Sequence, residues 1–115
     1  MAAQIMMVTG ATAGIGKQTA LELAKQGATV ILVARDRERG EATRAEVAAI
    51  AANSSVDLLL ADFADPASIR AMADTFKSRY DHLNVLVNNA GVYMTQRRET
   101  ADGLEMMFAN RKSVV

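Results

Sequence analysis

The chain is predicted to fold as one α/β domain of 115 residues, in which helices cover both faces of a parallel sheet. Three observations favour this fold class. Short apolar runs alternate along the sequence with longer segments of helical periodicity. The second run is continuously apolar and rich in β-branched residues, as is typical of a parallel strand that is buried on both faces. A glycine-rich turn joins the first run to the first helical segment.

The first half of the chain contains a strand, a helix and a second strand. Residues 4–9 form a short apolar strand, and a helical pattern then runs from the glycine turn to Gly27, which is expected to end the helix. Residues 28–34 form the second strand. The helix residues expected to face the sheet are Ile15, Thr19, Ala20, Leu23 and Ala24.

The next segments repeat this alternation. Residues 37–52 are rich in Ala, Glu and Arg and predict a helix, residues 53–55 form its terminating loop, and residues 56–61 form a third strand. Asp65 and Pro66 are typical of the cap and the first position of another helix. The stripe expected to be buried on that helix is Ile69, Met72, Ala73, Phe76 and Tyr80.

A fourth strand at residues 84–87 is followed by a loop over residues 88–98 and by a last helix that begins at Thr100 or Asp102. With right-handed crossovers the strands take the spatial order 3-2-1-4, and the sheet is truncated after the fourth strand and the following helix. The fourth strand is then an edge strand unless a downstream segment or another chain pairs with it. We therefore expect a homo-oligomer that forms through this edge or through the last helix, whose apolar residues are Leu104, Met106, Met107 and Phe108.

Composition narrows the functional classes. The 13 basic and 13 acidic residues cancel, so no net field favours a nucleic acid or an anionic membrane. The absence of cysteine excludes disulfides and thiolate metal sites. No apolar run approaches the length of a membrane span, and no targeting segment precedes the first strand. We expect a single domain over residues 1–115 that is cytoplasmic and holds no metal.

The glycine turn, Val8-Thr-Gly-Ala-Thr-Ala-Gly-Ile-Gly16, is the first element that indicates a ligand. Its glycines, Gly10, Gly14 and Gly16, stand where a strand ends and a helix begins. Glycine adopts positive φ there and lets a phosphate approach bare backbone at the positive end of a helix. The pattern therefore predicts a site for the pyrophosphate of a nucleotide cofactor. The alternative is an ordinary strand-to-helix turn whose glycines serve packing.

Four motifs follow the four predicted strands in order. They are Thr9-Gly10 with Gly14-Ile15-Gly16, then Ala34-Arg35-Asp36, then Asp62-Phe63, and finally Asn88-Asn89-Ala90-Gly91. With these motifs the chain resembles the N-terminal, cofactor-binding half of a short-chain dehydrogenase/reductase. Residues 100–108 further resemble the retinol-dehydrogenase-like branch of that family. The resemblance implies a Rossmann-type sheet and an oxidoreductase that exchanges hydride between NADP(H) and a carbonyl or an alcohol.

The resemblance also implies which residues bind the cofactor. Asp62 would bond the adenine amino group beside the Phe63 backbone, and Asn88, Ala90 and Gly91 would line the adenosine ribose. The alternative for Asp62 is a loop carboxylate that caps neighbouring backbone amides, and for the asparagine motif it is a structural turn. The residues expected to bind the cofactor are Thr9, Gly10, Thr12, Ala13, Gly14, Ile15, Gly16, Arg35, Asp62, Phe63, Asn88, Ala90 and Gly91.

The end of the second strand decides between NADP(H) and NAD(H). A carboxylate there bonds the ribose 2′-hydroxyl of NAD(H) and repels a 2′-phosphate. The strand instead ends at Ala34 and continues into Arg35, whose planar guanidinium suits a phosphate, so NADP(H) is predicted, with support from Lys17. Asp36 keeps NAD(H) as the alternative, because a shift of one residue would place its carboxylate at the strand end.

The residues that the family uses for hydride transfer are missing. The family's tyrosine needs a lysine four residues later to lower its pKa, but Asn84 follows Tyr80 at that spacing and Arg97 follows Tyr93. Asn110 is a candidate for the family's helper asparagine, displaced by one residue, or a plain helix-end residue. We therefore predict cofactor binding without turnover by this chain. A non-catalytic dinucleotide-binding or self-associating module is the alternative.

Overall fold

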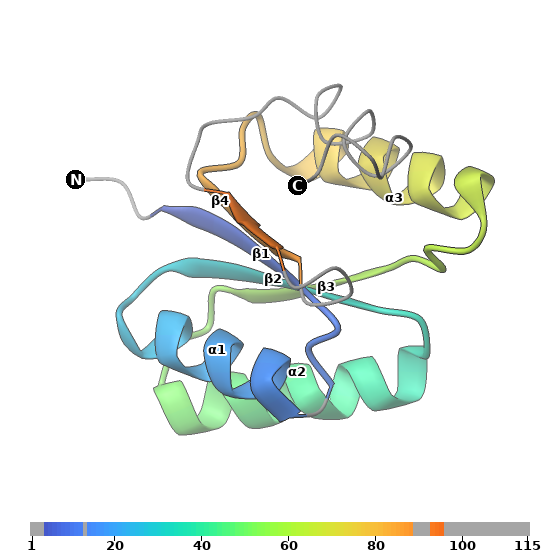
Figure 1. Cartoon of the computed structure of the whole chain (residues 1–115). Coiled ribbons are helices and arrows are strands. Elements are labelled where there is room, and N and C mark those ends of the chain that lie inside the picture. Colours follow the sequence, from blue (N-terminus) through green and yellow to red (C-terminus); the bar gives the residue numbers. More distant parts are fainter. Residues whose placement is uncertain (1–3, 13, 89–92, 96–115) are drawn as a thin grey trace.

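The computed structural model describes residues 4–12, 14–88 and 93–95 of the chain. In chain order the elements are β1 (Ile5–Thr9), α1 (Gly14–Lys25), β2 (Thr29–Ala34), α2 (Arg37–Ala51), β3 (Val56–Leu60), α3 (Pro66–Arg79), β4 (Val85–Asn88) and β5 (Tyr93–Thr95). They form three layers, with α1 and α2 on one face of the sheet and α3 on the other (Figure 1). The prediction of an α/β fold with helices on both faces is therefore confirmed.

The sheet has the order β3-β2-β1-β4-β5, and β1 to β4 are parallel. This confirms the predicted 3-2-1-4 arrangement. Because all four parallel strands point the same way, the segments that follow β1, β2 and β3 meet at one end of the sheet, where ligands bind in folds of this kind.

The fourth strand is not an edge, because a downstream segment pairs with it, as the sequence analysis allowed. β5 pairs antiparallel with β4, with Leu86 opposite Thr95 and Asn88 opposite Tyr93. Three residues inside a predicted loop are too few to show a period-two pattern, so no pattern in the sequence marks this strand. Pairing with β5 therefore removes the exposed edge of β4 through which we expected a homo-oligomer to form. The predicted last helix, at residues 100–108, lies outside the described residues.

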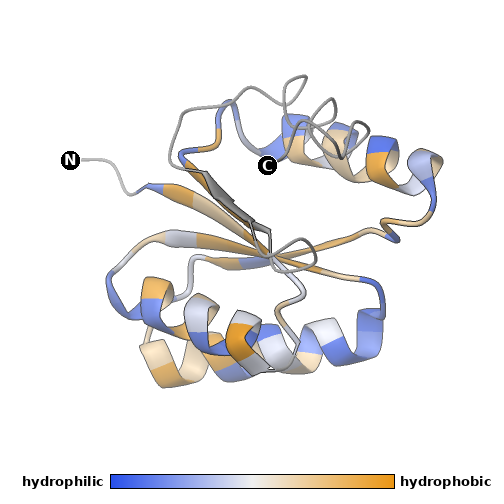
Figure 2. Ribbon diagram, viewed as in Figure 1, coloured by the Kyte–Doolittle hydropathy of each residue, from blue (hydrophilic) through white to orange (hydrophobic). Residues whose placement is uncertain are grey.

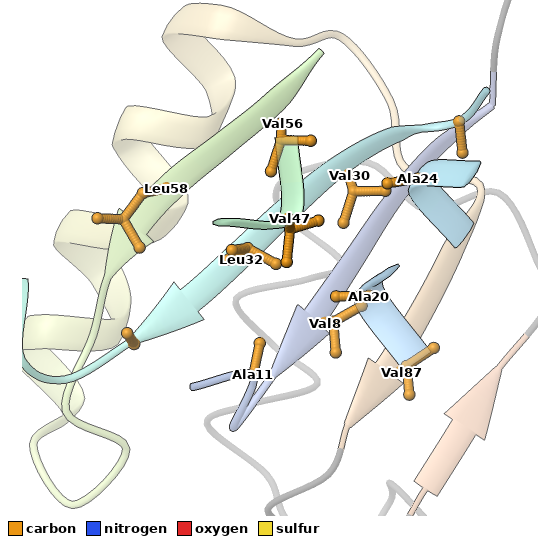
Figure 3. Packing of buried hydrophobic residues seen from close by; sticks show 12 residues of the cluster. Val8, Ala11, Ala20, Ala24, Val30, Leu32, Val47, Val56, Leu58 and Val87 are labelled. Carbon is orange, nitrogen blue, oxygen red and sulfur yellow. The ribbon is translucent and has the colours of Figure 1, made fainter. Parts of the chain in front are cut away.

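The sheet separates two apolar cores, because successive side chains of a strand point to opposite faces. Hydrophobic residues gather on the strands and on the helix faces turned toward them (Figure 2). The core against α3 contains Met7, Ile31, Val33, Leu59, Ala61, Ile69, Met72, Phe76, Leu83 and Leu86. The core against α1 and α2 (Figure 3) contains Val8, Ala11, Ala20, Ala24, Val30, Leu32, Val47, Val56, Leu58 and Val87 among its members.

The buried row on α1 differs from the predicted one. Gly16, Ala20 and Ala24, spaced four apart, are buried against the sheet. Ile15 is 79% exposed, so the expectation that it faces the sheet was wrong. Hydropathy marks Ile15 as a core residue, but the smallest side chains occupy the contact row. On α3 the predicted stripe is confirmed at four positions, Ile69, Met72, Ala73 and Phe76.

α2 packs unusually close to the sheet at Gly40. A Cβ at this position would lie 2.8 Å from Leu58 Cδ1 and 3.2 Å from Ala34 Cβ. Gly40 is buried although it lies within a helix, where glycine costs roughly 1 kcal/mol relative to alanine. The lack of a side chain therefore lets the first turns of α2 rest on the ends of β2 and β3.

Asn53 joins the α2–β3 loop to the end of α1 and to the residue before β2. Its Nδ2 donates to Ala24 O at 3.0 Å and to Ala28 O at 2.8 Å, and its Oδ1 accepts from the Ser55 N–H at 2.8 Å. Ala52 ends α2 in the left-handed conformation and turns the chain toward this contact. The predicted terminating loop at residues 53–55 thus connects α2 to the end of α1 and to the start of β2.

The edge strand β3 is joined to the end of α3 by Asp57. Arg79 Nη1 lies 2.9 Å from both carboxylate oxygens, the Tyr80 hydroxyl donates to Oδ2 at 2.9 Å, and the Leu58 N–H donates to Oδ1 at 2.8 Å. Partial burial works to raise the pKa of Asp57, but these hydrogen bonds and the Arg79 charge outweigh it, so the pKa lies below the usual 3.8. Burial of the phenol and its bond to the carboxylate raise the pKa of Tyr80 to about 12.

Candidate functional site

A cleft of about 440 Å³ opens where β1, β2 and β3 end. Its walls come from three segments that are far apart in the sequence and that the parallel sheet brings together. The lining residues are Gly10, Thr12, Val33, Ala34, Arg35, Asp36, Arg39, Ala61, Asp62, Phe63 and Ala64. Five of the predicted cofactor-binding residues are therefore in one cleft, namely Gly10, Thr12, Arg35, Asp62 and Phe63.

The glycine turn leads from β1 to the start of α1 on one side of this cleft. Gly10 has φ 61° and Gly14 has φ 59°, the left-handed region that favours glycine. Apart from the adjoining backbone, no atom of the described residues lies within 4 Å of the place where a Gly14 Cβ would stand, so the space beside the backbone is open. The first N–H groups of a helix have no intrahelical acceptor, and they carry the positive end of the helix dipole. This geometry suits an anionic group such as a pyrophosphate.

The segment after β2 brings a cation and a carboxylate to the cleft. Arg35 is exposed and follows directly on the last residue of the strand. Asp36 is the N-cap of α2, and its Oδ1 accepts from the Glu38 N–H at 2.9 Å. One carboxylate oxygen of Asp36 is thus engaged with the helix start, while no side-chain partner of the Arg35 guanidinium is found among the described residues.

The segment after β3 forms a tight turn around Asp62. Its Oδ1 accepts from the Ala64 N–H at 3.0 Å, and its own N–H donates to Ser68 Oγ at 2.8 Å. Asp62 therefore caps a neighbouring amide, as the alternative interpretation expected, and it also faces the cleft. The two roles are compatible because a carboxylate has two oxygens. Phe63 packs against the core beneath α3 and contributes an apolar surface to the cleft.

Other predicted residues lie outside the lining. Thr9 is fully buried, and its Oγ1 lies 3.5 Å from Val87 O, between β1 and β4. Gly16 is buried on α1, and Lys17 Nζ lies 2.8 Å from Glu46 Oε1, so its charge is paired with α2. Asn88 ends β4 beside Thr9. The predicted residues outside the described ranges are Ala13, Ala90, Gly91 and Asn110.

Arg39 is a lining residue that the sequence analysis missed. It is the third residue of α2 and is exposed. Its signal in the sequence is a basic residue four positions after Arg35 and in the first turn of a helix, where the dipole disfavours a cation. That signal is weak, because charged residues on an exposed helix face are ordinary.

The rest of the described structure restricts the chemistry. No group of three His, Asp or Glu side chains within residues 4–12, 14–88 and 93–95 is arranged to hold a metal ion. No helix in the described part of the chain is both long and apolar enough to cross a bilayer. Tyr80, one of the two tyrosines, lies at the far end of β3 from the cleft and donates to Asp57. The cytoplasmic location stays a prediction.

The comparison with protein families shows to which family the chain belongs. A family model described as short chain dehydrogenase matches residues 4–115. The chain belongs to the short-chain dehydrogenase family. Among curated relatives, retinol dehydrogenase 11 of Mus musculus is 48% identical over 103 residues, which cover 90% of this chain and 33% of that protein. The retinol-dehydrogenase-like resemblance is thereby confirmed, and the chain spans about one third of the length of this relative.

Solved short-chain dehydrogenases share the fold. Menthone neomenthol reductase from Mentha piperita superposes with a TM-score of 0.71 at 38% sequence identity, covering 79% of this chain and 32% of that one. An actinorhodin polyketide ketoreductase solved with NADPH gives a TM-score of 0.69 at 34% identity, covering 76% of this chain and 33% of that one. The family comparison thus agrees with the Rossmann-type sheet and with a nucleotide cofactor.

Proposed function

We propose that this chain is a cofactor-binding part of an oxidoreductase and that it binds NADP(H) in the cleft at the ends of β1, β2 and β3. The observation that carries the proposal is the meeting of Gly10, Arg35 and Asp62 around one cleft. The glycine turn offers backbone N–H groups to the pyrophosphate, and Asp62 offers a carboxylate oxygen to the adenine amino group. The residues for the ribose, Asn88, Ala90 and Gly91, stay a prediction of the sequence.

The preference for NADP(H) over NAD(H) rests on the residues after β2. A 2′-phosphate needs a cation at the strand end, and Arg35 is exposed at that position. Asp36 is the residue that would favour NAD(H), but one of its oxygens already accepts from the Glu38 N–H. The NADPH found with the actinorhodin ketoreductase is consistent with this choice.

We further propose that this chain by itself does not transfer hydride. The reaction needs a group that moves a proton at the substrate oxygen, and a tyrosine does so near neutral pH only where a cation lowers its pKa. Tyr80 has the opposite environment, since burial and Asp57 raise its pKa to about 12. Neither Tyr80 nor Tyr93 has a lysine four residues later. Cofactor binding is therefore the activity assigned to the chain, and catalysis would need residues beyond it.

A binding titration with one substitution tests the proposal. The chain contains no tryptophan, so the fluorescence of NADPH and NADH can be followed with little background from the protein. Loss of a charged hydrogen bond costs about 1.5–3 kcal/mol, so Arg35→Ala is expected to weaken NADPH roughly 10- to 150-fold and to leave NADH nearly unchanged. Arg70→Ala, an exposed arginine on α3 that does not line the cleft, is the matched control. Equal affinities of the unmodified chain for NADPH and NADH would overturn the assignment of Arg35.

A further inference from the structure

We propose that the outer side of β3 binds an extended peptide segment of another protein, which pairs with β3 as a parallel strand and places an acidic side chain against Arg37. The site is a groove of about 380 Å³, with residues 57–60 of β3 as its floor and with α2 and α3 as its two walls. The groove shares no lining residue with the cofactor cleft. This interaction surface is therefore separate from the proposed function.

The main chain of β3 offers hydrogen-bonding groups to this groove. β3 is an edge strand, because among the described residues it pairs on one side with β2 and on the other side with no strand. Ser55 O and the Ala61 N–H bond to β2. Peptide groups of successive residues point to opposite sides of a strand, so those of Leu58 and Leu60 point away from β2. An edge of this kind is a template for a further strand.

Asp57 determines which of these groups remain for a ligand. Its Oδ1 accepts from the Leu58 N–H at 2.8 Å, whereas Leu58 O and the Leu60 N–H have no hydrogen-bond partner among the described residues. A parallel strand uses this remaining pair, because its residue opposite Leu59 donates to Leu58 O and accepts from the Leu60 N–H. An antiparallel strand opposite Leu58 would also need the occupied N–H. The free groups therefore favour a parallel partner.

The two walls of the groove determine the side chains that the bound segment needs. Leu59 belongs to the core beneath α3, and Leu60 packs against the core beneath α2. Side chains of paired strands point to the same face at opposite positions, so the ligand residue opposite Leu59 faces α3 and the next one faces α2. The α3 wall includes Ala71 and Met72, which suit an apolar side chain, and the α2 wall includes Arg37.

The charges in the groove favour an acidic residue at the second of these positions. Four charged side chains line the groove, and three of them have partners. Arg79 Nη1 lies 2.9 Å from Asp57 Oδ2, and Glu41 Oε2 lies 3.1 Å from Arg44 Nε. Arg37 is exposed and has no partner among the described residues, although it is the first residue of α2, where the helix dipole disfavours a cation. An Asp or Glu directly after the apolar residue would supply the missing partner.

An NMR titration of the ¹⁵N-labelled chain with short capped peptides tests the proposal. The parent peptide is acetyl-Thr-Thr-Val-Glu-Thr-amide, whose valine is the residue placed opposite Leu59. Three matched peptides carry glutamine in place of glutamate, an N-methyl group on the valine, or an N-methyl group on the glutamate. The two methylated peptides have the same composition, but only the valine N–H is expected to donate to Leu58 O.

Two arginines of one helix provide the matched variants of the chain. Arg37→Ala removes the cation that lines the groove. Arg39→Ala removes the same charge two residues later, where the side chain is also exposed but does not line the groove. Circular dichroism confirms that each variant is folded, and the measured quantity is the dissociation constant of each peptide.

The parent peptide should produce saturable shifts that are largest at the Leu60 amide. The glutamine peptide should bind about two- to fivefold more weakly, the range of an exposed ion pair. Arg37→Ala should abolish this difference between the two peptides, and Arg39→Ala should preserve it. The N-methyl group on the valine should weaken binding at least about fivefold, and the one on the glutamate should weaken it by less than about twofold.

Four results would overturn the proposal. The first is a Leu60 amide that does not shift with the parent peptide at up to about 5 mM, a concentration that detects even millimolar affinity. The second is an equal loss of affinity for the two methylated peptides, and the third is an equal effect of Arg37→Ala and Arg39→Ala. The fourth is a Leu60 shift that grows with the concentration of the chain alone, which would assign the groove to a second copy of the chain.

Discussion

Replacement of Asn53 by alanine should destabilise the chain without touching the cleft. The substitution removes two donated hydrogen bonds, to Ala24 O and Ala28 O, and one accepted bond, from the Ser55 N–H. Ala24 O keeps a second donor, the Gly27 N–H at 3.0 Å, so it is not left unpaired. Ala28 O loses the one donor found for it among the described residues. With each net hydrogen bond worth about 1 kcal/mol and the Ser55 bond open to replacement by water, the expected loss is about 2 kcal/mol.

Urea unfolding followed by circular dichroism measures this loss. With a slope of about 1.5 kcal/mol per molar urea, the midpoint of Asn53→Ala should fall by about 1 to 1.5 M. Asn53→Asp is a second test, because it keeps the acceptor for Ser55 but places a negative charge beside two carbonyl oxygens. It should destabilise the chain at least as much as alanine. A midpoint within about 0.3 M of the unmodified chain for either variant would refute the reasoning.

Four further predictions follow from particular contacts. The folded pKa of Tyr80, about 12, lies above its ordinary 10.0, so its hydrogen bond to Asp57 stabilises the fold below pH 10 and is lost as the pH rises toward 12. Between pH 8 and pH 11, the free energy of unfolding in urea should therefore decline less for Tyr80→Phe than for the unmodified chain. An equal decline of the two would contradict the contact. Asp57→Asn should remove stabilisation that is present above pH 3.8 and is lost as the pH falls further, since the folded pKa of Asp57 lies below that value. Gly14→Ala should lower the free energy of unfolding by only about 1–2 kcal/mol, which is the cost of a left-handed alanine. It should weaken the affinity for NADPH at least about tenfold, and an unchanged affinity would place the pyrophosphate elsewhere. Gly40→Val should cost about 1–3 kcal/mol by overpacking against Leu58, and an unchanged thermal midpoint would show that α2 can move away from the sheet.

Most of the fold follows from local signals that the sequence carries strongly. Continuous apolar runs predicted β2 and β3 to within one residue, and the Asp65 cap with Pro66 predicted the start of α3. β5 was not predicted, because a strand of three residues is too short to show a period-two pattern of apolar and polar residues. Ile15 was misplaced because hydropathy ranks residues by apolarity, whereas close helix packing selects the small residues Gly16 and Ala20.

The residues of the candidate site likewise divide into those that the sequence predicts and those that only the assembled fold reveals. Gly10, Arg35 and Asp62 were predictable, because motifs at the carboxyl ends of parallel strands must converge. Arg39 was not, because its position at the cleft depends on how closely α2 approaches the sheet at Gly40. Asn53 was read as a loop residue, since its partners at Ala24 and Ala28 are more than twenty residues away and only the assembled fold brings them within reach.

An NMR titration of the ¹⁵N-labelled chain with NADPH tests the central claim most directly, because it reports which backbone amides sense the cofactor. The account predicts the largest shifts at Gly10, Thr12, Arg35, Asp62 and Phe63, with saturation at one cofactor per chain. No shifts, or shifts concentrated around Asp57 and Arg79 at the other end of β3, would contradict the account.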